Sequence, residues 1–204
     1  MKEKYQEDLA EIRSVMHRSS RFLSLSGTSG IVVGFLGLAA AYLAYELVFR
    51  NTDYLKFSAV EIPAEQQLQL VFIAAGTLIV SIVLTVLFTA RQSRNRGESL
   101  WNHQSRRILY RLAVPLLAGG VASIILFSHG YIGLVIPLLL LFYGLGLFAA
   151  SGITYAVVEV LGITQLLLGL LALLFVEQGI ILWAAGFGVA HIVYGLIVRQ
   201  KYKL

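Results

Sequence analysis

The chain has 204 residues, of which 58% are hydrophobic and 13% are charged, and its mean hydropathy is +0.79. Soluble domains carry about a quarter of their residues as charged side chains, so this composition excludes an ordinary soluble enzyme and a disordered protein. The chain has no cysteine, which excludes a disulfide-stapled secreted scaffold. The composition therefore predicts a protein whose main surroundings are lipid.

Six long apolar runs follow one another along the chain. Crossing roughly 30 Å of hydrocarbon takes about 20 helical residues, and continuous runs of that length do not fit the short alternating strands of a β-barrel. The sequence therefore predicts an all-α bundle of six transmembrane helices over residues 22–198. The predicted spans are 22–49, 68–90, 108–127, 131–150, 153–176 and 180–198.

Lysine and arginine are distributed unevenly over the predicted connections. With six spans, both tails and the connection between the second and third spans share one side, and that side holds all but Arg50 and Lys56 of the 16 cationic residues. Because cationic loops resist translocation, we expect the N- and C-termini to be cytoplasmic and the protein to lie in the inner (cytoplasmic) membrane. The net charge of +5 is explained first by this topology. Nucleic-acid binding is the weaker interpretation of the same charge, since no recognisable nucleic-acid-binding module accompanies it.

The polar N-terminal tail, residues 1–21, is predicted to be an amphipathic helix on the cytoplasmic membrane surface. Alternatively, it docks on a partner. The C-terminal residues 199–204 form a short basic cytoplasmic tail. Four apolar residues of the N-terminal tail share one helix face, namely Tyr5, Leu9, Ile12 and Met16.

The connection between the second and third spans is polar, basic and carries a tryptophan. We expect a solvated loop on the cytoplasmic side; a specific site for anionic phospholipid headgroups or for a protein partner is the alternative, because clustered arginines attract anionic lipid and tryptophan favours the headgroup level. The candidate anionic-lipid contacts are Arg91, Arg94, Arg96, Trp101, Arg106 and Arg107.

Four polar side chains within the spans, Arg111, Glu159, Gln165 and His191, are candidates for an intramembrane site, because an ionisable group there is costly. At 1.5 Å per residue, Arg111 lies roughly 5 Å and Glu159 roughly 9 Å inside the cytoplasmic boundary. We therefore expect an ion pair between them if the third and fifth spans are adjacent. The hairpin of the fifth and sixth spans places Gln165 opposite His191, which predicts that the amide bonds an imidazole nitrogen.

Small residues on the same helix faces indicate that these polar groups point into the bundle. Two roles stay open for them: hydrogen bonds that set the helix register, or a proton-linked or substrate-binding site. The predicted interior faces comprise Ala184, Gly188, His191 and Gly195 on the sixth span, and Tyr155, Glu159, Gly162 and Gly169 on the fifth.

Gly30 and Gly34 form a GxxxG pair in the first span. Such pairs let two helix backbones approach closely. The contact lies within one chain or between two, so a homo-oligomer through Gly30 and Gly34 is one alternative.

The sequence offers no convergent set of reactive groups, which catalysis needs. It has no HExxH motif and no P-loop, and its four histidines are scattered over tails, loops and different spans. A metal site needs three or four ligands brought together, and no spacing here suggests one. We therefore expect no enzyme activity, no cofactor and no metal.

The last third of the chain holds a set of aromatic, aliphatic, small and polar residues, namely Tyr155, Glu159, Leu161, Gly162, Leu168, Gly169, Leu170, Trp183, Gly186, Phe187, Gly188, His191, Tyr194 and Gly195. With these residues it resembles an uncharacterised family of small six-span inner-membrane proteins found in Bacteroidota. The resemblance extends to the N-terminal stretch from Tyr5 to Phe22. It implies membrane location and makes Glu159 and His191 part of the family pattern; it supplies no catalytic or binding residue.

These observations predict an integral membrane protein without enzyme activity that scaffolds, senses or regulates through its basic cytoplasmic face. The alternative is a small-molecule or ion transporter or channel with a polar site between the third, fifth and sixth spans.

Overall fold

The computed structural model describes residues 26–95 and 101–201. Within these residues the chain is helical without any strand, and six helical segments are long and apolar enough to cross a membrane. The predicted all-α, multi-pass class is confirmed. The first five spans are α2 (Gly27–Ala44) with the π-helical turn η1 (Tyr45–Phe49), α3 (Ala64–Asn95), α4 (His103–Ser128), α5 (Ile132–Ser151) and α6 (Ala156–Leu174).

The sixth span, Val176–Lys201, is composite and is called here the last span. It joins η2 (Val176–Gln178, a 3-10 turn), α7 (Gly179–Trp183), the π-helical stretch η3 (Ala184–Ala190) and α8 (His191–Lys201). No pattern in the sequence predicted η3. Residues 1–21, predicted as an amphipathic helix, lie outside the described residues.

Two helices run well beyond the apolar runs from which they were predicted. α3 has 32 residues, because polar residues such as Gln66 and Arg91 continue the helix past the hydrocarbon core. α4 begins at His103 because Asn102 caps it: the Asn102 side chain accepts a hydrogen bond from the Ser105 backbone N–H at 2.9 Å. Hydrophobicity measures the part of a helix that lipid covers, and capping decides where the helix starts.

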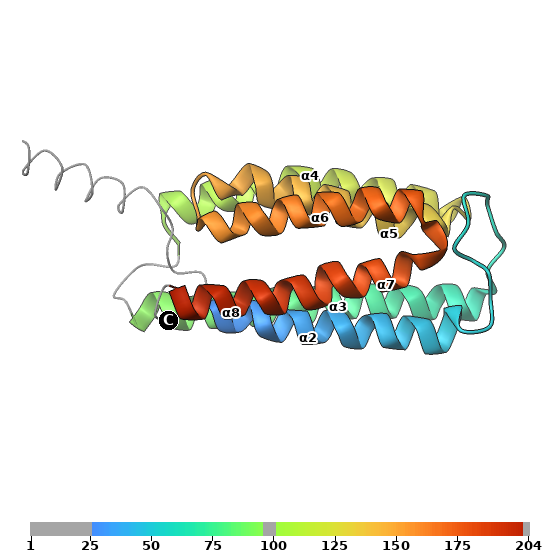
Figure 1. Cartoon of the computed structure of the whole chain (residues 1–204), viewed down its shortest axis with the longest axis horizontal. Helices are drawn as coiled ribbons and strands as arrows, with labels where there is room; N and C mark the ends of the chain where they lie inside the picture. Colours follow the sequence, from blue (N-terminus) through green and yellow to red (C-terminus); the bar gives the residue numbers. More distant parts are fainter. Residues whose placement is uncertain (1–25, 96–100, 202–204) are drawn as a thin grey trace, which may run out of the picture.

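The six spans form two layers of three (Figure 1). In one layer α5 lies between α4 and α6, and in the other α2 lies between α3 and the last span. The layers join where the last span packs on α6 and α5. α3 and α4 are the outermost helices, and many large apolar side chains on both are exposed, as expected for surfaces that face lipid.

Glycines bring the paired helices close together. A Cβ atom on Gly34 of α2 would lie 2.7 Å from the Gly188 carbonyl oxygen of the last span, and a Cβ on Gly30 would lie 3.1 Å from the Gly195 Cα. The GxxxG pair is therefore buried against the last span of the same chain, which is the within-chain contact that the sequence left open, and the alternative of a homo-oligomer stays a prediction. Close packing of small residues is the usual way in which membrane helices associate.

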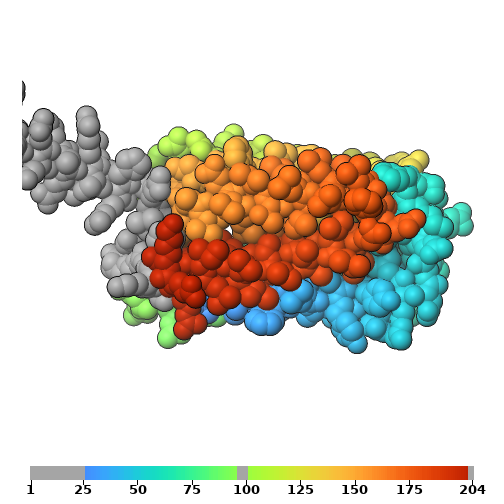
Figure 2. All heavy atoms as spheres, viewed as in Figure 1, coloured from blue at the N-terminus to red at the C-terminus, as the bar shows by residue number. Residues whose placement is uncertain are grey.

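The two ends of the bundle differ in charge. The end where α3 and α8 finish and α4 starts is called the basic end, and Glu159 is the one acidic residue there among the described residues. The opposite end, called the acidic end, has Arg50 and Lys56 as its described cations and is covered by the loop of residues 50–63 (Figure 2). The acidic residues at that end are Glu46, Asp53, Glu61, Glu65 and Glu177.

Candidate functional site

Polar side chains from three spans form one hydrogen-bonded network inside the bundle, and two of them reach the same backbone carbonyl. The Nε2 atom of Gln165 on α6 donates to the Gly186 oxygen at 2.8 Å, and the Nδ1 atom of His191 lies 2.9 Å from the same oxygen. The hydroxyl of Tyr143 on α5 lies 2.8 Å from Nε2 of His191. Together these four residues are called the interior network. It joins α5, α6 and the last span near the middle of the bundle.

The partners of His191 determine which ring nitrogen carries the proton. A carbonyl oxygen can only accept, so Nδ1 donates to Gly186. In the neutral imidazole Nε2 is then an acceptor, and the Tyr143 hydroxyl donates to it. Both ring nitrogens are thus satisfied by protein groups.

The interior network is enclosed by aromatic rings and is buried. Gln165 is 0% exposed and His191 is 4% exposed. The Phe187 ring packs against Tyr143, with centroids 5.1 Å apart, and against His191 at 5.9 Å, and Trp183 packs on Phe187 at 4.3 Å. This packing holds the His191 ring in place and fixes the register of the last span relative to α5.

One polar atom of the interior network has no partner among the described residues. The Oε1 atom of Gln165 is buried without a hydrogen bond, while its Nε2 atom is committed to Gly186. The site leaves little room, since a Cβ on Gly186 would lie 2.6 Å from this Oε1 atom. A buried unpaired acceptor costs about 1–3 kcal/mol of stability, and this cost opposes the stabilisation from the hydrogen bond that Gln165 donates to Gly186.

The expected contact between Gln165 and His191 is correct in place and wrong in detail. The depth argument brought the two side chains to the same level, and both reach the same carbonyl. They do not bond each other. The Gly186 carbonyl accepts from both, and the hydroxyl of Tyr143, not the Gln165 amide, bonds the Nε2 atom of the imidazole. Tyr143 was missed, although a lone tyrosine hydroxyl amid an apolar run needs a partner when buried.

The expected ion pair between Arg111 and Glu159, two described residues, does not form. Arg111 donates from Nη1 to the Ala149 carbonyl at 3.0 Å, and Glu159 is exposed. Ala149 lies in the last turn of α5, where carbonyls lack helical partners and a positive charge is favourable. Arg111 thus caps α5.

Glu159 has a different structural reason for its place. α6 begins at Ala156, later than the predicted span, so Glu159 lies in the first turn, where negative charge is favoured. It follows buried Val158 by one residue and therefore points about 100° away from it. The expectation that Glu159 faces the interior is wrong, whereas Gly162 and Gly169 on the same helix are buried.

The predicted lipid-contacting residues lie at the basic end, apart from the interior network. Arg96 is outside the described residues. The others are exposed, namely Arg91, Arg94, Trp101, Arg106 and Arg107, and Arg199 and Lys201 of α8 add to the same end.

The chemistry available to the interior network is limited to hydrogen bonding and proton exchange between a phenol and an imidazole. The described residues contain no group of three or more His, Asp or Glu side chains that could hold a metal ion. Comparisons of the chain with protein-family models, curated proteins and solved structures gave no match.

Proposed function

We propose that this protein is a non-enzymatic component of the inner (cytoplasmic) membrane that scaffolds, senses or regulates through its basic end. In this proposal the basic end faces the cytoplasm, both termini are cytoplasmic, and the partner is anionic: phospholipid headgroups or an acidic protein surface.

The concentration of exposed cations at one end is the observation that carries the proposal. Three elements deliver them to the same end, since α3 finishes there, α4 starts there and α8 finishes there. Clustered arginines attract anionic headgroups and acidic partners, and an excess of cations favours the cytoplasmic side.

The state of the interior supports the same proposal. Both ring nitrogens of His191 are satisfied by Tyr143 and Gly186, and Gln165 is buried with them. A network whose polar groups bond one another stabilises helix packing and suits a rigid support for the charged end better than a passage for solutes.

The experiment is an affinity pull-down of the full chain from native membranes, with the partner identified and its binding repeated with purified components. The basic-end variant combines Arg106→Gln and Arg107→Gln, and the matched control combines Arg50→Gln and Lys56→Gln at the acidic end. We expect a partner that the wild type and the control retain and the basic-end variant loses. Absence of a stable partner, together with substrate flux in proteoliposomes, would contradict the proposal.

A transporter or channel for a small molecule or an ion is the second candidate. The observation that favours it is the π-helical stretch η3 around Gly186, because π-bulges occur frequently at functional sites, with the unpaired Gln165 Oε1 atom beside it. In this case the polar site lies between α5, α6 and the last span. Proton-coupled flux that is lost in His191→Leu and kept in Glu159→Gln would favour this candidate.

A further inference from the structure

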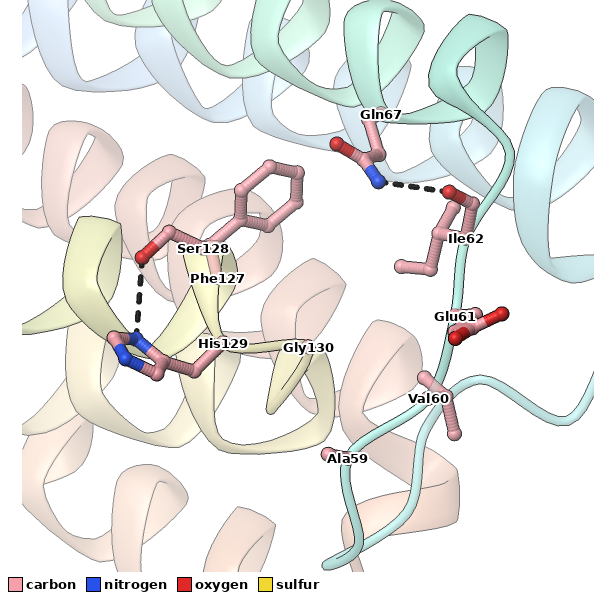
Figure 3. A pocket seen from close by; sticks show the side chains of 9 residues that line it. All are labelled: Ala59, Val60, Glu61, Ile62, Gln67, Phe127, Ser128, His129 and Gly130. Atoms are coloured by element: carbon pink, nitrogen blue, oxygen red, sulfur yellow. Dashed lines mark hydrogen bonds between the residues drawn. The ribbon is translucent and has the colours of Figure 1, made fainter.

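A cavity of about 650 Å³ opens at the acidic end, remote from the interior network. It lies between residues 59–62, which precede α3, and residues 127–130, which end α4 (Figure 3). It is open to the surface, and the side chains of Glu61, Gln67 and His129 that line it are exposed. A backbone hydrogen bond from the Val60 N–H to the Gly130 carbonyl, 3.0 Å long, ties the two walls together, and Gly130 holds the turn with a φ of +80°.

Side-chain hydrogen-bond donors around this cavity are already used. The Nε2 atom of Gln67 donates to the Ile62 carbonyl at 2.7 Å. The Ser128 hydroxyl donates to the Ile125 carbonyl at 2.8 Å, and Nδ1 of His129 donates to that same carbonyl at 2.8 Å.

The acceptors around the cavity, in contrast, remain available. Because Nε2 of Gln67 is committed, its Oε1 atom is free to accept, and Figure 3 shows this oxygen on the side that faces Phe127. The carboxylate of Glu61, which also lines the cavity, has no hydrogen bond or ion pair with another described residue. The side chains that line the cavity therefore present acceptors and one negative charge.

The nearby cations do not neutralise that charge. Arg50 pairs with Glu46 at 2.6 Å and Lys56 pairs with Asp53 at 3.7 Å, so Glu61 keeps its charge uncompensated by any described side chain. A ligand that fits must bring a positive charge and hydrogen-bond donors.

Apolar side chains also line the cavity, so an inorganic cation would leave part of it unfilled. Ile62 and Phe127 point toward the space from opposite walls (Figure 3). Ile62 is 8% exposed and belongs to the core, so an aliphatic chain would meet its edge and pack chiefly on the half-buried Phe127, whose aromatic face also attracts an ammonium group.

We propose that this cavity binds an organic ammonium group, with the nitrogen toward Glu61 and Gln67 and the carbon chain against Ile62 and Phe127. The group is carried by a free alkylamine or by an ethanolamine headgroup of a lipid, since the cavity lies where α3 enters and α4 leaves the membrane. The inference does not rest on the proposed function, which concerns the other end of the bundle.

The test uses the purified full chain in detergent micelles, with n-butylammonium chloride as the free probe and thermal unfolding as the readout. Sodium chloride at equal ionic strength and sodium butyrate are the controls. The lipid source is tested by comparing nanodiscs of phosphatidylethanolamine with nanodiscs of phosphatidylglycerol. Native mass spectrometry counts the lipid molecules that the protein retains. The variant is Glu61→Gln, and Glu65→Gln, an exposed neighbour in the first turn of α3 that does not line the cavity, is its matched control.

We expect saturable binding of n-butylammonium, or selective retention of phosphatidylethanolamine, that weakens at least tenfold in Glu61→Gln and is unchanged in Glu65→Gln. The first result identifies a free amine and the second a lipid headgroup as the source. Equal binding of butyrate, binding of Ca²⁺ in place of the amine, an effect that Glu61→Gln does not change, or no saturable binding in either arm would each overturn the proposal.

Discussion

The hydroxyl of Tyr143 and the Nε2 atom of His191 lie 2.8 Å apart across the interface between α5 and the last span. This hydrogen bond joins two helices through residues that are 48 positions apart in sequence. The His191 ring is also held by Gly186 and by Phe187. Because the imidazole is already ordered by these contacts, its hydrogen bond to Tyr143 requires no additional loss of side-chain freedom.

Removing the Tyr143 hydroxyl is expected to destabilise the bundle. Tyr143→Phe keeps the ring packing and leaves Nε2 of His191 without its donor, so the free energy of unfolding should fall by about 1 kcal/mol, the scale of interhelical hydrogen bonds in membranes. Denaturant unfolding in micelles measures this. Tyr131→Phe, at the exposed start of α5, is the control and should change stability by less than about 0.5 kcal/mol. Equal effects of both substitutions would remove the structural role of this bond.

Two glycines are expected to respond oppositely to the same substitution. Gly34→Ala places a methyl group 2.7 Å from the Gly188 carbonyl oxygen, which forces α2 away from the last span and should cost about 1–3 kcal/mol. Gly76→Ala in α3 meets no atom within 4 Å and should stabilise by about 0.5–1 kcal/mol, because alanine has the higher helix propensity. The ranking of melting temperatures checks both signs; a stabilised Gly34→Ala variant would show that these helices do not approach as described.

Gln165→Met tests whether the amide is needed for packing. The substitution removes one donor to Gly186 and also the unpaired Oε1 atom. Because His191 still satisfies the Gly186 carbonyl, the two effects should nearly cancel, with a net change within about 1 kcal/mol. Denaturant unfolding of this variant beside Tyr143→Phe provides the comparison. A loss larger than that of Tyr143→Phe would mean that the Gln165 amide contributes more to the interior network than its hydrogen bond to Gly186 indicates.

A double-mutant cycle on Arg111 and Glu159 should show no coupling. Arg111→Met removes the bond to the Ala149 carbonyl and should destabilise, whereas Glu159→Gln changes an exposed side chain and should have an effect below about 0.5 kcal/mol. Their effects should add to within about 0.5 kcal/mol. A larger interaction energy in unfolding measurements would restore the ion pair.

The spans were predictable because a helix in hydrocarbon needs an unbroken apolar run, and the sequence contains six such runs. Their ends were less predictable. Asn102 starts α4 through a cap, and α6 starts at Ala156, after the apolar run has begun. These ends depend on capping and turns, which mean hydropathy does not measure.

The candidate site was predictable in depth and not in direction. Counting residues from the hairpin turn placed Gln165 and His191 at one level, because the helical rise is constant. The same count says nothing about the face of α6 on which a side chain lies, and the spacing that grouped Glu159 with Gly162 and Gly169 placed it on the wrong face. The π-helical stretch that presents the Gly186 carbonyl changes the angular positions of the side chains around the last span, and no residue pattern predicted it.

The central claim is that the basic end is cytoplasmic, and single-cysteine labelling tests it most directly because the chain has no cysteine of its own. Ser58→Cys lies in the loop at the acidic end and Gln200→Cys lies in α8 at the basic end, both at exposed positions. In intact spheroplasts, a membrane-impermeant maleimide should label Ser58→Cys at once and Gln200→Cys only after permeabilisation. Labelling of Gln200→Cys in sealed spheroplasts, with Ser58→Cys protected, would contradict the account.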